Sequence, residues 1–169
     1  MQDVKERVAL GSIFASGAMT IAKGAVGVTT GSLAILSEAA HSLIDFVATV
    51  MTYSAVRVSG KPADDEHHYG HGKVESMAAL VETALLFVLS GVVIYEAINR
   101  LFGEHHAVEA SIPAFAVIGA SIVIDFFRAR ILNKVARETS SHALEADALH
   151  FSSDLWSSLA VLVGLAGVA

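Results

Sequence analysis

The sequence contains no cysteine, only two prolines and few charged residues. The absence of cysteine excludes disulfides and thiolate ligands, so any metal site in this chain must be built from His, Asp and Glu. With 11 basic against 17 acidic residues, the formal net charge is −6 and no basic patch is present. Nucleic acid is therefore not expected as a partner, because such binding needs clustered Lys and Arg.

The chain is rich in apolar sequence. Hydrophobic residues make up 54% of its 169 residues and charged residues 17%, which is too apolar for an ordinary soluble domain. A helix needs roughly 20 mostly apolar residues to cross the hydrocarbon core of a membrane. Five segments qualify, and they predict an all-α fold, a polytopic transmembrane helix bundle. They cover residues 8–29, 33–56, 77–102, 112–132 and 143–168.

The basic residues are distributed unevenly among the connections between these segments. Nine of the eleven lie before the first segment, around the second-to-third loop, or around the fourth-to-fifth loop. Because loops rich in Lys and Arg stay on the cytoplasmic side, we expect a multi-pass protein of the inner or plasma membrane with a cytoplasmic N-terminus. Five crossings place the C-terminus outside. The sequence ends in an apolar run, 155–169, so we expect the natural protein to continue.

Two of the apolar segments each contain a His and an Asp four residues apart, His41 with Asp45 and His150 with Asp154. On a helix this spacing puts both side chains on one face, one turn apart. Ionisable groups within lipid are costly, and they mark an ion site or a proton relay by default. Two imidazole nitrogens and two carboxylate oxygens together offer a tetrahedral site for Zn²⁺.

The predicted topology allows the two His/Asp faces to meet. The second segment runs inward and the fifth runs outward, and each pair lies on the order of 10–20 Å from the nearest helix end. His41 can then face Asp154 while Asp45 faces His150. The alternative is two unrelated buried contacts in which each His bonds its own Asp, although a lone pair in hydrocarbon carries a heavy desolvation cost.

At these residues the chain resembles the cation diffusion facilitator family of metal/proton antiporters. The matching stretches are GSLAILSEAAHSLID at 31–45, PADDEHHYGHGKVE at 62–75 and ADALHFSSD at 146–154. They fall, in the family's order, on the second helix, the following cytoplasmic loop and the fifth helix. The resemblance implies a homodimer whose protomers have six transmembrane helices and usually a cytoplasmic metal-sensing domain. By this comparison the sixth helix and that domain are missing from the sequence.

The resemblance also implies that His41, Asp45, His150 and Asp154 form the transport site. Within the family, His at the first of these positions is associated with zinc preference, whereas Asp there accompanies broader selectivity. Imidazole in place of a hard carboxylate disfavours Mn²⁺ and Mg²⁺ relative to Zn²⁺. Zinc is therefore the predicted cargo, and Cd²⁺, Fe²⁺, Mn²⁺ and Co²⁺ are the alternatives.

Metal and protons are expected to compete for this site. Zinc binding needs neutral imidazoles and ionised carboxylates, so it releases protons. Because imidazole has a reference pKa of about 6.5, His41 and His150 are the predicted proton carriers. The predicted mechanism is alternating access, in which an inward proton gradient drives metal efflux.

A second cluster lies in the loop after the second segment. Asp64, His67 and His71 are spaced by three and four residues, which suits one face of a helical turn, and they match the family's second metal site. Asp65 and His68 are possible substitutes as ligands. The alternative is a hydrophilic loop whose acids and histidines are solvated.

Further polar residues lie within the apolar segments. Asp125 can form a local ion pair with Arg128 one turn on, which is favoured over a transport role. Asp147 precedes His150 by three residues and is expected either to orient its ring by a hydrogen bond or to act as a first-turn carboxylate favoured by the helix dipole. Glu38 and Glu82 are further carboxylates that could face a polar cavity, and neither is assigned a role.

Two other classes of function fit parts of the pattern. A membrane-embedded metalloenzyme would keep an open zinc position beside a base, but four matched ligands favour a closed site and no nucleophile motif accompanies them. No enzymatic activity is therefore predicted. A non-transporting metal sensor would bind metal at the loop while nothing crosses the membrane. Hydrolysis without flux would support the enzyme, and binding without flux would support the sensor.

Overall fold

The computed structural model describes residues 1–31, 33–102 and 112–168, and these residues form five helices and no strand. The all-α class expected from the sequence is confirmed. Each helix contains one of the five predicted apolar segments and extends beyond it at one end or both. The helices are α1 (Gln2–Thr30), α2 (Leu33–Ser59), α3 (Lys73–Phe102), α4 (Ile112–Thr139) and α5 (His142–Val168).

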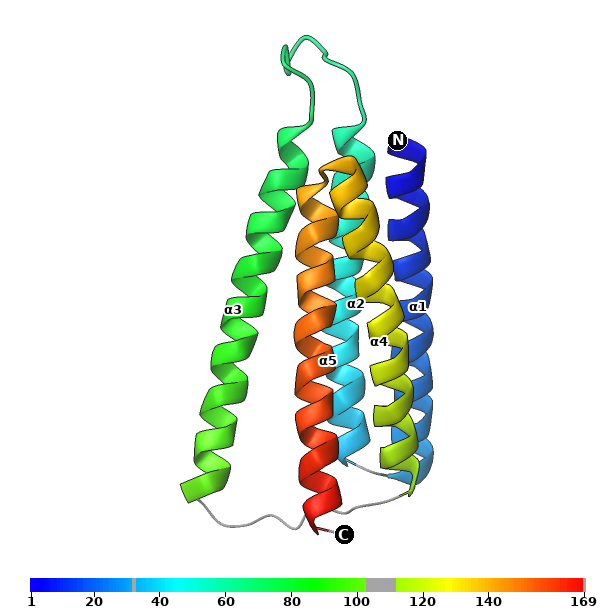
Figure 1. The fold of residues 1–169 in the computed structure, drawn as a ribbon, viewed down its shortest axis with the longest axis vertical. Coiled ribbons are helices and arrows are strands. Elements are labelled where there is room, and N and C mark those ends of the chain that lie inside the picture. The colour runs from blue at the N-terminus through cyan, green and yellow to red at the C-terminus, as the bar shows by residue number, and fades with distance from the viewer. Residues whose placement is uncertain (32, 103–111, 169) are drawn as a thin grey trace.

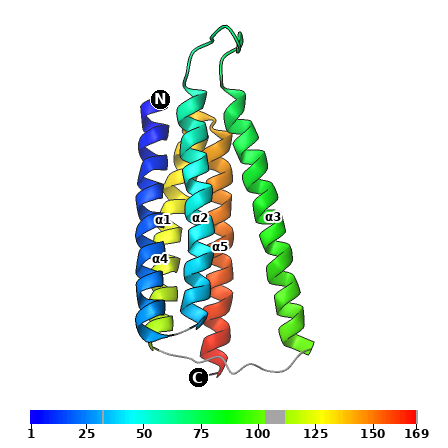
Figure 2. The same ribbon diagram turned by 180° about the vertical axis from the view of Figure 1, so that it is seen from behind.

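The helices alternate in direction and lie roughly along one axis (Figures 1 and 2). The N-terminus, the α2–α3 loop and the α4–α5 turn share one end of the bundle, which we call the loop end. Helices α1, α2, α4 and α5 pack side by side, whereas α3 contacts mainly α5 and α2. In both views α3 tilts away from the other helices toward the opposite end.

The turn between α1 and α2 depends on a glycine. Gly31 ends α1 with a φ of 67° and a ψ of 12°, the left-handed conformation that commonly closes a helix. A side chain at such a position is strained, whereas glycine adopts it without steric cost. This cap turns the chain back on itself, so α2 packs antiparallel along α1.

Small residues permit the close packing of α1 against α2. A Cβ added to Gly27 would lie 2.9 Å from the side chain of Leu36, and one added to Gly17 would lie 3.3 Å from the ring of Phe46. Nearer the loop end, the buried core is formed by Ala9 of α1, Val56 of α2 and apolar residues of α4 and α5. Small residues such as Gly17 and Gly27 let helix backbones approach closely in membranes.

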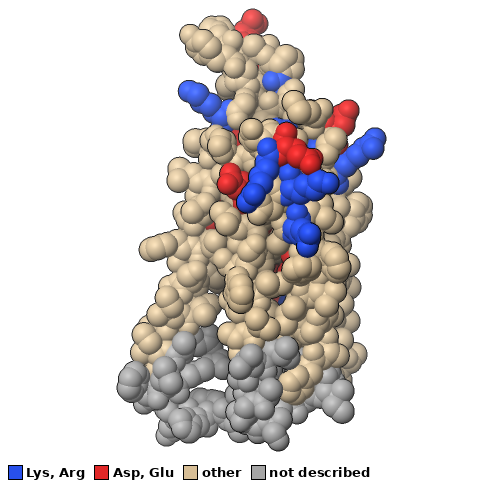
Figure 3. Space-filling model, in the orientation of Figure 1, with Lys and Arg blue, Asp and Glu red and all other residues tan. Residues whose placement is uncertain are grey.

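The outer surface is suited to lipid. Many large apolar side chains are exposed, particularly along α3. On the face shown in Figure 3, charged side chains gather toward the loop end. Among the described residues, the helices at 2–30, 35–59 and 73–95 are long and apolar enough to cross a membrane. The count of five crossings stays a prediction.

Candidate metal site

The four predicted ligands lie together between the middle parts of α2 and α5. His150 Nε2 lies 3.0 Å from Asp45 Oδ1, across the interface between the two helices. His41 Nε2 lies 3.7 Å from Asp154 Oδ1, also across that interface. This is the cross-helix arrangement expected from two antiparallel helices, while the role of the four residues as metal ligands stays a prediction.

The contacts within each helix are present as well. His41 Nε2 is 3.8 Å from Asp45 Oδ1, and His150 Nε2 is 3.4 Å from Asp154 Oδ2. Each His is therefore closer to the Asp of the other helix than to its own, so the four do not form two unrelated pairs. One atom each of His41, Asp45 and Asp154 lie within 4.8 Å of one another, a spacing that a single ion can bridge.

Access to this cluster is unequal on its two sides. The side chain of His150 is 3% exposed, whereas that of His41 is 33% exposed. His41 is also nearer the end of the bundle where α3 tilts away from its neighbours (Figure 1). An ion bound between the four donors would therefore be shielded beside His150 and more accessible beside His41.

A buried cation lies next to this cluster. Arg128 of α4 donates from Nη2 to Ser12 Oγ at 2.8 Å and to Ser16 Oγ at 3.0 Å, and its guanidinium carbon lies 3.5 Å from the ring centroid of Phe151. Asp125 lies 3.7 Å from Arg128, as expected for a local ion pair. The guanidinium thereby joins α1, α4 and α5 behind the candidate ligands.

Asp147 does not orient the ring of His150 through a hydrogen bond, so that part of the sequence interpretation is wrong. His150 Nδ1 is buried without a hydrogen-bond partner among the described residues. Asp147 instead accepts a hydrogen bond from Ser12 Oγ at 3.4 Å and contacts Glu82 of α3. The carboxyl group turns toward α1 because the hydroxyl of Ser12 lies there.

The loop cluster also comes together, but through a different backbone from the one expected. Residues 60–72 form turns and bends rather than a helical turn. Asp64 Oδ1 lies 3.1 Å from His67 Nδ1, and Asp64 Oδ2 lies 3.4 Å from His71 Nε2. The carboxylate sits between the two imidazoles because the chain folds back on itself, with the His71 ring also near the Pro62 carbonyl.

The backbone favours the ionised form of the loop carboxylate. The N–H of His67 donates to Asp64 Oδ1 at 2.7 Å, and this hydrogen bond holds the pKa of Asp64 below its usual value. A carboxylate with a lowered pKa stays ionised at neutral pH and is available as a ligand. Asp64, His67 and His71 could therefore hold a metal ion at the surface. Asp65 and His68, the possible substitutes, are not in this group.

Sequence reasoning missed a polar cluster at the loop end, which we call the Glu75 clasp. Lys5 Nζ lies 2.5 Å from Glu75 Oε1, and Ser59 Oγ donates to the same oxygen at 2.6 Å. Ser141 Oγ donates to Glu75 Oε2. One carboxylate thus joins α1, the end of α2, the start of α3 and the α4–α5 turn.

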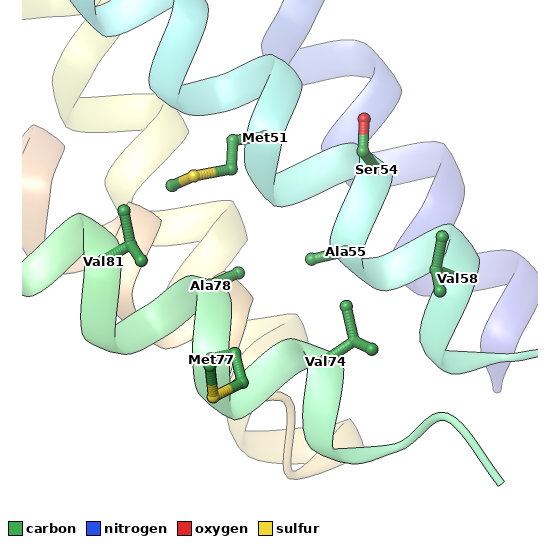
Figure 4. Close-up of a pocket in the computed structure, with 8 residues that line it drawn as sticks. All are labelled: Met51, Ser54, Ala55, Val58, Val74, Met77, Ala78 and Val81. Atoms are coloured by element: carbon green, nitrogen blue, oxygen red, sulfur yellow. The ribbon is translucent and has the colours of Figure 1, made fainter. Parts of the chain in front are cut away.

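The groove between α2 and α3 is not an ion site. Met51 and Val58 of α2 face Met77 and Val81 of α3 across it, and none of its eight lining residues carries a charge (Figure 4). Such a surface offers no ligand for a cation.

Comparison with known proteins finds one matching family model and several relatives. A family model described as the cation efflux transmembrane domain matches residues 9–169. The magnetosome protein MamB of Magnetospira sp. (strain QH-2) is 34% identical over 163 residues, which cover 95% of this chain and 55% of that protein. The cation-efflux pump FieF of Citrobacter koseri is 37% identical over 142 residues, 80% of this chain and 45% of the pump.

A plant protein is similar over much of the chain as well. Metal tolerance protein C1 of Arabidopsis thaliana is 33% identical over 163 residues, which cover 88% of this chain and 35% of that protein. The chain therefore spans from about a third to about half of the length of these relatives.

Proposed function

The chain belongs to the cation efflux family, and from this premise we propose that it exports Zn²⁺ from the cytoplasm in exchange for protons. The single observation that carries the proposal is the meeting of His41, Asp45, His150 and Asp154 across the α2–α5 interface. The protein is integral to a membrane, and its family carries divalent metal cations. The identity of the metal and the proton exchange are the proposed parts.

The donor set supports zinc. Two nitrogens and two oxygens match the ligands of four-coordinate Zn²⁺, and neither carboxylate is tied to a Lys or Arg within ion-pair distance among the described residues. A site with two imidazoles disfavours Mg²⁺ and Mn²⁺, which prefer oxygen ligands. Cd²⁺, Co²⁺ and Fe²⁺ are the alternative cargoes, because they also accept imidazole.

Protons enter through the chemistry of the same ligands. A metal ion replaces the protons that His41 and His150 carry when they pair with Asp154 and Asp45. A high external proton concentration then favours metal release on the outside, and a low internal one favours loading from the cytoplasm. Exchange at one site couples the two gradients without any covalent chemistry.

The orientation follows from the charged loop end. We place the N-terminus, the α2–α3 loop and the α4–α5 turn in the cytoplasm, because most basic residues gather there. The Glu75 clasp then holds the cytoplasmic end together, while the more exposed His41 lies toward the outside. This arrangement fits a carrier whose cargo site faces outward. We also propose the homodimer that the family resemblance implies.

The transport proposal is tested by zinc uptake into proteoliposomes that contain the natural full-length protein under an imposed pH gradient. Uptake is expected to require the gradient and to be lost in His150→Ala and Asp154→Ala. The matched controls are His142→Ala and Glu145→Ala, which change exposed residues of the same helix. Gradient-driven uptake that survives both site variants contradicts the assignment.

A second function is supported for the loop. Asp64, His67 and His71 lie together at the exposed loop end, so we propose that they gather cytoplasmic metal before it reaches the transport site. If the protein binds Zn²⁺ at the loop but moves none across the membrane, the sensor is the better interpretation.

A further inference from the structure

Two buried carboxyl groups lie outside the four-donor site, which is formed by His41, Asp45, His150 and Asp154. Glu82 of α3 is 1% exposed and Asp147 of α5 is fully buried. Thr52 Oγ1 donates to Glu82 Oε2 at 2.9 Å, and Ser12 Oγ donates to Asp147 Oδ2 at 3.4 Å. Each carboxyl group has one oxygen with such a donor, while Glu82 Oε1 and Asp147 Oδ1 have none among the described residues.

The two carboxyl groups are within hydrogen-bonding reach of each other. Two ionised carboxylates in contact repel each other, and neither can donate a hydrogen bond. A single proton shared between them removes the repulsion and provides the missing donor. Carboxyl groups held together in this way titrate as a pair rather than as two independent acids.

The groups around Glu82 and Asp147 fit a state in which the pair holds one proton. Arg128 of α4 lies within electrostatic range of Asp147, and His150 of α5 lies within that range of both carboxyl groups. Among the described residues of α1 and α2, only Ser12 and Thr52 bond them, each through its hydroxyl. With one shared proton the pair carries one negative charge, and the guanidinium of Arg128, which also pairs with Asp125, is the nearby positive charge.

The pair lies directly behind the four-donor site. Asp147 precedes His150 by three residues on α5, which is about one turn toward the loop end. A divalent cation beside His150 Nε2 brings two positive charges into a region of low dielectric constant. Positive charge there favours the ionised form of both carboxyl groups, so the shared proton becomes easier to lose.

We propose that Glu82 and Asp147 form a proton-carrying site of the transport cycle that is separate from the metal ligands. The proposal rests on the metal/proton exchange proposed above. The pair holds one proton while the four-donor site is without metal. When the metal binds, the O–H bond breaks and the proton passes to water on the side to which the site is open. The pair takes up a proton again when the metal leaves.

The experiment counts the protons released per Zn²⁺ bound. The natural full-length protein in detergent is titrated calorimetrically with Zn²⁺ near neutral pH in buffers of different ionisation enthalpy. Glu82→Gln and Asp147→Asn each place an amide N–H where the shared proton lies, so each is expected to release about one proton fewer than the parent. The double variant is expected to lose the same single proton, because both changes remove one shared group.

The control is Glu145→Gln, an exposed carboxyl group on the same helix, which is expected to release the parental number of protons. If both single variants match the parent, the pair carries no exchangeable proton and the inference is overturned. Losses that add to two protons in the double variant also overturn it, because they show two independent acids. If the parent binds no Zn²⁺, the proposed function itself fails.

A second measurement needs no variant at this pair. Infrared difference spectra of the parent protein, with and without Zn²⁺, are expected to show loss of the carbonyl stretch of a protonated carboxylic acid when the metal binds. Metal binding that leaves this band in place contradicts the proposal even if the variants do not fold. A structural role alone would change stability but neither the proton count nor the band.

Discussion

Replacing Glu75 by Gln is expected to loosen the loop end of the bundle. The carboxylate accepts from Lys5, Ser59 and Ser141, and its side chain is 8% exposed, so little water competes for these contacts. Gln has nearly the same shape but no charge. Its amide group also turns a donor toward groups that are themselves donors.

The size of the effect follows from the contacts. Hydrogen bonds to charged groups contribute about 1.5–3 kcal/mol each, and part of this is retained by the amide oxygen. A net loss on the order of 2 kcal/mol is expected for the closed state of the loop end. At about 1.4 kcal/mol for each factor of ten, the fraction of molecules whose loop end is open rises by roughly 30-fold.

The chain lacks cysteine, which makes this population measurable. Ala143, buried at the start of α5, is changed to Cys, and the rate of labelling by a membrane-impermeant maleimide is compared with and without Glu75→Gln. The rate is expected to rise by roughly the factor given above. Glu138→Gln, an exposed change near the same end, is the control. A rate within twofold of the parent refutes the role of the clasp.

Three other predictions concern the rest of the bundle. Arg128→Met removes a buried cation and leaves its acidic neighbours uncompensated, so stability in detergent is expected to fall by about 3–5 kcal/mol; an unchanged denaturation midpoint contradicts this. Gly31→Val forces a branched side chain into a φ of 67°, and chemical denaturation is expected to show a loss of about 1–2 kcal/mol; equal stability would mean that the turn adopts another conformation. Asp64→Asn is expected to remove zinc binding by the loop in equilibrium dialysis, because the amide replaces a carboxylate held ionised by its lowered pKa, while His68→Ala binds as the parent does. Retained binding in Asp64→Asn excludes the loop site.

The helices and the four-donor cluster were accessible from the sequence because they depend on periodic features. Apolar runs of membrane length gave the five helices. An i, i+4 spacing put His41 beside Asp45 and His150 beside Asp154, and the antiparallel order of the segments predicted the pairing across helices. Each of these inferences uses spacing within one helix, together with the rule that successive helices alternate in direction.

The remaining contacts depend on distances between residues far apart in the chain. Glu75 looks like an ordinary first-turn acid of α3, and nothing nearby in the sequence shows that Ser141 will bond it. Asp147 was expected either to orient the ring of His150 or to act as a first-turn carboxylate. The hydroxyl of Ser12 on α1 lies in reach instead, and the first-turn acid of α5 is Glu145. The loop around Asp64 has no periodic pattern, so its turns were not predictable from spacing.

One divalent ion is proposed to bind between α2 and α5. The direct test is anomalous X-ray diffraction at the zinc absorption edge from crystals of the full-length protein grown with Zn²⁺. A peak is expected about 2.0–2.2 Å from His150 Nε2 and from a carboxylate oxygen of Asp45. Zinc peaks elsewhere in the protein, with none between these two helices in either the inward-open or the outward-open form, would contradict it.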